Sequence, residues 1–216
     1  KILIKVTTMK ILKINFWQIF MVFAFTLLVF GTSYAQKEQW YGAFTYSVSL
    51  PAGDTKTFVD EISWRGIGLD YRYVIDRAYS VGLFFGWNVF YQRSEETTEV
   101  ENGAVTGTSD HYLNAFPIMA NIHYYFGERK SIRPYVGLNA GGYIMTQRFE
   151  VSIFALQEDQ WQWGVAPEAG VIIPVEKDFG IMLNGKYNYA FTGESVFGED
   201  INHSYWQINA GFVWEP

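Results

Sequence analysis

The chain contains no cysteine among its 216 residues. It can therefore form no disulfide, no thiolate metal site and no cysteine nucleophile. Its three histidines are scattered, whereas a zinc site draws on several clustered His and Cys ligands, so no metal is expected. A Gly-rich phosphate loop and a dinucleotide fingerprint are also missing, and no cofactor is expected.

Basic residues are few once the first 35 positions are set aside. Of the 16 Lys and Arg, four lysines lie in that segment, which leaves 12 basic residues against 22 acidic ones and a net charge of −10. Proteins that bind nucleic acid present a positive surface to the phosphate backbone. The charge balance therefore excludes nucleic acid as a partner.

Long apolar runs are absent except near the start, where Phe16–Phe30 is apolar at all but two positions. Lysines precede this run and small residues follow it, which is the pattern of a secretory signal peptide. A retained membrane anchor is the alternative, but the run is shorter than the ~20 residues of a spanning helix. We therefore predict a signal peptide over residues 1–35, with Met9 as a candidate start, and a single domain over residues 36–216.

The rest of the chain alternates apolar and polar residues with period 2, which is typical of strands that have one apolar and one polar face. The clearest example is the segment Phe179–Thr192. We predict eight strands, at Gln39–Leu50, Glu61–Ile75, Tyr79–Arg93, Asp110–Phe126, Ile132–Arg148, Glu158–Pro174, Phe179–Thr192 and His203–Trp214. In the fourth, Asn114 interrupts the apolar face, and Pro117 cannot donate to a ladder, so a bulge is expected there.

Short and long connections alternate between these segments. Asp76–Ala78 is short, for example, whereas Pro51–Asp60, Ser94–Ser109 and Phe149–Gln157 are longer. Outer-membrane barrels have short periplasmic turns and longer outer loops, and their strands need only ~9–11 residues to cross the bilayer. The predicted fold is therefore all-β, an eight-stranded antiparallel up-and-down transmembrane barrel in the cell outer membrane. A secreted β-sandwich that binds a partner is the non-membrane alternative.

Several segments also resemble the small OmpA/OmpX-like outer-membrane β-barrel family of Gram-negative bacteria. They are Tyr124–Gly127, Arg133–Tyr143 and the closing strand Trp206–Trp214. The resemblance implies the barrel fold and a place in the cell envelope, and it carries no chemistry. It also implies contact with the barrel-assembly machinery, which reads a terminal aromatic residue. Here Glu215 and Pro216 follow Trp214, so that signal is slightly displaced.

Charged residues on the predicted polar faces are expected to line the barrel interior. They are Asp70, Arg72, Glu168 and Lys186. Buried charges must be paired, and Glu168 and Lys186 lie on neighbouring strands. Eight strands enclose a space about wide enough for side chains alone, which favours a filled interior over a gated pore. The remaining space is assigned to Tyr135, Asn139, Tyr143 and Gln207.

The predicted outer loops are acidic. The interaction surface assigned to them comprises Glu95, Glu96, Glu99, Glu101, Glu194, Glu199 and Asp200. Carboxylates bind hard cations, which would bridge them to anionic lipopolysaccharide. The segment 97–106 reads as a hairpin tip turning at Asn102-Gly103, and its exposed strand edge would suit an extracellular protein partner. The partners predicted are thus outer-membrane lipid, lipopolysaccharide and an extracellular protein.

A catalytic role has little support in the sequence. Ser109 and His111 are two residues apart and share a face, but no third group completes a triad. We therefore predict no enzyme and no catalytic residue. The primary hypothesis is a structural or interaction protein of the envelope, acting in envelope integrity or adhesion. A narrow porin-like channel and a lipid-modifying outer-membrane enzyme are the alternatives.

Overall fold

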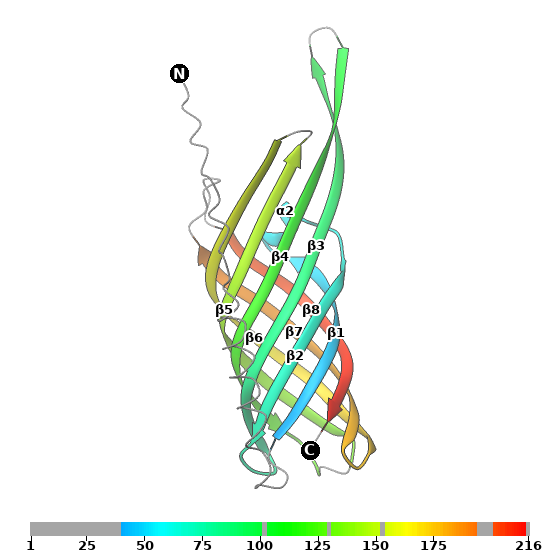
Figure 1. Ribbon diagram of the computed structural model, residues 1–216, viewed down its shortest axis with the longest axis vertical. Coiled ribbons are helices and arrows are strands. Elements are labelled where there is room, and N and C mark those ends of the chain that lie inside the picture. Colours follow the sequence, from blue (N-terminus) through cyan, green and yellow to red (C-terminus); the bar gives the residue numbers. More distant parts are fainter. Residues whose placement is uncertain (1–39, 101–102, 129–130, 152–153, 194–200, 215–216) are drawn as a thin grey trace, which may run out of the picture. The chain divides into compact units, whose positions relative to one another are not determined.

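The computed structural model describes residues 40–100, 103–128, 131–151, 154–193 and 201–214. The eight strands pair in sequence order, and β8 pairs with β1, so the sheet closes into an antiparallel up-and-down barrel (Figure 1). This confirms the predicted fold. The predicted signal peptide lies outside the described residues.

The strands differ in length. They are β1 Trp40–Ala52, β2 Ser63–Val74, β3 Tyr79–Val100, β4 Gly103–Tyr125, β5 Arg133–Val151, β6 Phe154–Glu176, β7 Phe179–Gly193 and β8 Ile201–Trp214. One short helix, α2 (Thr55–Phe58), interrupts the connection between β1 and β2. Across the parts of the chain that the structure describes, no helix has the length and apolar character to cross a membrane.

Period-2 alternation decides which side chains face the interior. In β7 the residues Met182, Asn184 and Lys186 are buried, while Ile181 and Leu183, which alternate with them, are 37% and 42% exposed. The barrel thus has a polar interior and an apolar outer face. This is the reverse of a soluble core, and it suits a protein whose outer surface meets lipid.

Aromatic residues gather at the end of the barrel where the short turns lie and where the last strand ends. Trp40 stacks on Tyr71 with ring centroids 4.9 Å apart, and Tyr79 packs against Tyr124 at 5.0 Å. Trp214 is also exposed there. Rings with a polar edge are stable at a lipid–water interface, so these residues form one of the two girdles of a membrane barrel.

Two of the predicted long loops are mostly strand. β3 and β4 run on to Val100 and Gly103, which are paired with each other. β5 and β6 likewise pair as far as Val151 and Phe154. The predictions of loops over residues 94–109 and 149–157 were therefore wrong. A strand that extends beyond the membrane has no side that faces lipid. Its residues therefore need not alternate between apolar and polar, and the period-2 pattern used to predict strands is lost.

The prediction of a bulge at Pro117 was also wrong. Ile118 pairs with Phe85 and Ala115 with Asn88, so the register of β3 and β4 is the same on both sides of the proline. Pro117 interrupts the pairing to β3 without inserting a residue. Gly86 leaves room for its ring, since a Cβ at Gly86 would lie 2.8 Å from Pro117 Cγ.

Candidate functional site

A cluster of charged side chains fills the end of the lumen nearest the short turns, and Arg72 lies at its centre. The Arg72 side chain is fully buried, and its guanidinium donates to Asp70 at 2.6 Å and to Glu168 at 3.1 Å. It also donates to the hydroxyls of Tyr41 and Tyr125, at 3.2 and 3.0 Å. The planar fork of arginine suits several acceptors at once.

Glu168 is the acceptor that joins this cluster across the barrel. Its Oε1 lies 3.1 Å from the Arg72 guanidinium and 2.6 Å from His123 Nε2. Its Oε2 accepts from Lys186 Nζ at 2.8 Å and from Asn139 Nδ2 at 3.1 Å. Each carboxylate oxygen therefore has two partners, and these partners come from β2, β4, β5 and β7.

The structure brings together all four charged residues assigned to the interior from the sequence. Asp70, Arg72, Glu168 and Lys186 are all at most 6% exposed. The two acidic and two basic groups among these four balance in formal charge. A buried charge without a partner costs several kcal/mol, so we regard this balance as the condition for burying any of them.

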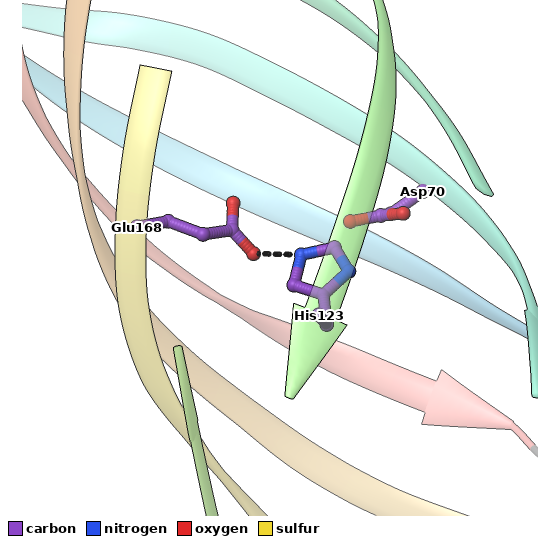
Figure 2. A group of neighbouring side chains, drawn as sticks. All are labelled: Asp70, His123 and Glu168. Carbon is purple, nitrogen blue, oxygen red and sulfur yellow. Dashed lines mark hydrogen bonds and ion pairs between the residues drawn. The ribbon is translucent and has the colours of Figure 1, made fainter. Parts of the chain in front are cut away.

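Asp70, His123 and Glu168 also have the composition of a metal site. Their ligand atoms lie within 4.8 Å of one another, and Figure 2 shows the three side chains converging from different strands. The carboxylates, however, already contact Arg72 and Lys186. A divalent cation would add positive charge to a balanced cluster, so the donor set fits an ion-pair network better than a metal centre.

Above the charged cluster the lumen is filled by amides and hydroxyls. Asn209 donates to Asn184 at 2.5 Å, and Gln207 donates to both Ser47 and Asn209 at 2.9 Å. Asn188 donates to Gln207 at 2.9 Å. Such side chains, each buried and bonded to its neighbours, leave the lumen cross-linked rather than open.

The connection between β1 and β2 folds into the outer mouth of the barrel. Thr55 of α2 is fully buried, and its Oγ1 accepts from the backbone N–H of Ser204 at 2.8 Å. His203 lies 3.4 Å from Thr55 and 2.7 Å from Gln147. Val59 is fully buried against Phe90 and other core residues. The connection is thereby held at the mouth by an apolar contact and a polar one.

Tyr41 and Tyr125 of this interior were not identified from the sequence, and Phe84 was placed on the polar face of its strand without a role. Tyr41, Phe84 and Tyr125 are each at most 3% exposed and contact the charged cluster or its cations. Phe84 lies under the Lys186 ammonium, 3.5 Å from ring centroid to Nζ. The signal that could have found them is their position, because each has the same strand parity as a polar interior residue.

The acidic residues assigned to loops are placed differently. Glu95, Glu96 and Glu99 belong to β3, and Glu95 is exposed. The other four, Glu101, Glu194, Glu199 and Asp200, lie outside the described residues. Gly103 pairs with Val100 and so belongs to β4, and Asn102 of the predicted turn lies outside the described residues.

Ser109 and His111 make hydrogen bonds that do not link them. Ser109 Oγ donates to the carbonyl oxygen of Ser94 at 3.4 Å. His111 Nδ1 lies 2.8 Å from the carbonyl oxygen of Phe58, so this nitrogen carries the proton. A nucleophile needs its hydroxyl directed at a basic nitrogen, and this geometry does not provide that arrangement.

Comparison with known proteins agrees with this description. A family model for the outer membrane protein beta-barrel domain matches residues 21–214. Neisserial surface protein A is similar in structure, with a TM-score of 0.53 and 13% identity, over 82% of this chain and 97% of that one. No curated protein matches the sequence.

Two further solved structures share lower similarity. Outer membrane protein OprG from Pseudomonas aeruginosa has a TM-score of 0.47 and 13% identity, over 84% of this chain and 97% of that one. The attachment invasion locus protein Ail of Yersinia pestis, in complex with the heparin analogue sucrose octasulfate, has a TM-score of 0.46 and 18% identity, over 83% and 100%.

Proposed function

Because this chain belongs to the outer membrane protein beta-barrel domain family and so resides in the outer membrane, we propose that it is a closed scaffold that presents an acidic hairpin to partners outside the cell. The observation that carries the proposal is the length of β3 and β4. Their ladder continues to Val100 and Gly103, whereas β2 pairs with β3 only as far as Asn88.

The hairpin formed by β3 and β4 beyond that point has an open edge. In the described ladders, residues 90–100 of β3 pair with β4 alone. Figure 1 shows this hairpin extending past the neighbouring strands at the end opposite the C-terminus. An open edge offers backbone donors and acceptors in a row, which an extended peptide can use to add a strand.

The charge of the hairpin selects the partner. Residues 94–109 include Glu95, Glu96, Glu99 and Glu101 and contain no Lys or Arg. Like charges repel, so a second copy of the same edge is disfavoured as the added strand. A basic extended segment of another protein is favoured for the same reason, and interaction with such a partner supports adhesion.

Shortening the hairpin should weaken this binding. Ser94 and Ser109 are paired, so replacing residues 95–108 by Asn-Gly closes a two-residue turn on the existing register. We expect this variant, in lipid nanodiscs, to bind an immobilised peptide of alternating lysine and valine at least about tenfold more weakly than the full chain.

A charge variant separates the contribution of the acidic side chains to peptide binding from that of the open strand edge. The triple substitution Glu95→Gln, Glu96→Gln and Glu99→Gln keeps the length of the hairpin and removes its described acids. It should retain part of the binding and lose most of its salt dependence. Equal peptide binding by the full chain and the shortened variant would refute the proposal.

The closed lumen predicts that the protein does not conduct. Because ion pairs, amides and the β1–β2 connection fill successive layers of the barrel, no discrete conductance steps are expected in planar lipid bilayers. A matched preparation of a known open porin is the positive control. Reproducible steps that change when Lys186 is replaced by Met would instead establish the narrow channel.

The remaining parts of the proposal concern chemistry and assembly. We propose that the protein is not an enzyme, which is supported by the separate hydrogen bonds of Ser109 and His111. Bridging of its acidic residues to lipopolysaccharide by divalent cations, and contact of the last strand with the barrel-assembly machinery, stay predictions.

A further inference from the structure

A groove of about 480 Å³ lies on the outer face of the barrel across β1 to β4. Its lining includes Tyr46, Arg65, Ile67, Trp87, Tyr112 and Asn114. Ile67 and Trp87 are 41% and 45% exposed, so this is a surface that meets the membrane and not part of the lumen. The groove thus combines apolar walls with a cation and an amide.

The walls of the groove are held in place by neighbouring contacts. The Tyr46 hydroxyl donates to the backbone carbonyl of Trp64. Trp87 stacks on Phe116 with ring centroids 5.6 Å apart, and its indole N–H lies 3.5 Å from Asn114 Oδ1. A groove whose sides are fixed before binding costs little ordering when a chain enters it.

Arg65 differs from the other outward-facing arginines at this end of the barrel. Arg93 donates to both carboxylate oxygens of Asp110, at 2.8 and 3.1 Å, and Arg148 pairs with Glu150. Arg65 is exposed and makes no salt bridge to any residue that the structure describes. Its guanidinium therefore retains its donors for an anion from outside the chain.

The position of Arg65 identifies where that anion comes from. β2 begins at Ser63, directly after the long β1–β2 connection, so Arg65 lies near the outer end of its strand. Long connections of an outer-membrane barrel face outside. An anion at this height, next to aromatic residues of the interface, is the head group of an outer-leaflet lipid.

We propose that this groove binds one acyl chain of a phosphorylated glycolipid, the lipid A part of lipopolysaccharide, with a phosphate on Arg65. The guanidinium fork matches two phosphate oxygens. The amide nitrogen of Asn114 is placed to donate to an ester or hydroxyl oxygen of the same lipid. The polar interruption of the apolar face at Asn114 thereby has a role in binding.

Native mass spectrometry of the full barrel refolded in detergent tests the proposal. The protein is titrated with diphosphoryl lipid A, with the same lipid after dephosphorylation and with phosphatidylglycerol. We expect diphosphoryl lipid A to bind most tightly, and Arg65→Gln to weaken its binding about tenfold through loss of a charge-assisted contact.

Arg148→Gln is the matched control, because it removes the same charge from the same end of the barrel and leaves the groove intact. Its affinity for lipid A should stay within about twofold of the unmodified protein. Equal weakening of lipid A binding by both substitutions would show that the effect comes from net charge alone, and would overturn the proposed binding site. Equal binding of phosphatidylglycerol, with the same dependence on Arg65, would overturn the assignment to lipid A.

A second variant tests the groove without touching the cation. Val89 also lines it and is only partly exposed, so Val89→Trp should fill the space for the acyl chain while Arg65 remains. We expect weaker lipid A binding with an unchanged heat-dependent shift in gel migration, which reports a folded barrel. Unchanged binding in this variant would place the lipid elsewhere.

Discussion

Replacing Glu168 with Ala is expected to lower the free energy of unfolding by about 3–5 kcal/mol. The substitution removes the common acceptor of Arg72, Lys186 and His123. Within the cluster, Arg72 and Lys186 would then remain with only Asp70 to balance them. Leaving a buried charge unpaired costs more than the ion pair itself contributes, so the loss should exceed that of a surface carboxylate.

Urea unfolding in lipid vesicles, followed by tryptophan fluorescence, measures this difference. Glu61→Ala is the control, since Glu61 is exposed just before β2 and should change stability by less than about 0.5 kcal/mol. The double variant Glu168→Leu with Lys186→Met should recover part of the loss, because it removes one stranded cation. A Glu168→Ala variant as stable as the control would show that the cluster is hydrated.

Replacing Gly211 with Val should prevent the barrel from closing normally. A Cβ at Gly211 would lie 2.0 Å from the carbonyl oxygen of Phe44 and 2.6 Å from Thr45 Cα. These are backbone atoms of β1, which pairs with β8 at the seam of the barrel. Overpacking typically costs roughly 1–3 kcal/mol, and a clash with backbone cannot be relieved by a side-chain rotation.

Gel migration with and without heating provides the measurement, because a closed barrel resists detergent until it is heated. The Gly211→Val protein should show a much reduced fraction of the heat-sensitive band. Gly185→Val is the matched control, since nothing lies within 4 Å of a Cβ at Gly185. If the Gly211 variant closes normally, or if both variants fail equally, then the contact of Gly211 with β1 is not what closure depends on.

The interior could be predicted from the sequence because strand geometry leaves little choice. Alternation in β7 places Lys186 on the same face as Asn184 and Asn188. β6 and β7 are neighbouring strands, and Glu168 pairs with Lys186 in their ladder, beyond an irregularity between Pro174 and Glu176. What could not be predicted is the reach of Arg72 to both acids, since that depends on side chains crossing the lumen.

The outer parts of the barrel were harder to predict for a physical reason. Residues of β3 beyond Arg93 have no lipid-facing side, so their strand carries charges and threonines like a loop. Exposed arginines are common, so the sequence does not distinguish Arg65, whose distinguishing feature is that it makes no salt bridge to any residue that the structure describes. Pro117 is the converse case. A proline inside a strand predicts a disrupted ladder, but the space beside Gly86 accommodates its ring.

The length of β3 also sets a distance. The segment from Val89 to Val100 rises about 3.3 Å per residue, roughly 40 Å measured along the strand. The head groups and the first sugars of the outer leaflet form a hydrated, anionic layer above the lipid. We expect the described part of the hairpin, up to Val100 and Gly103, to cross that layer, so that the proposed partner meets it at the outer surface.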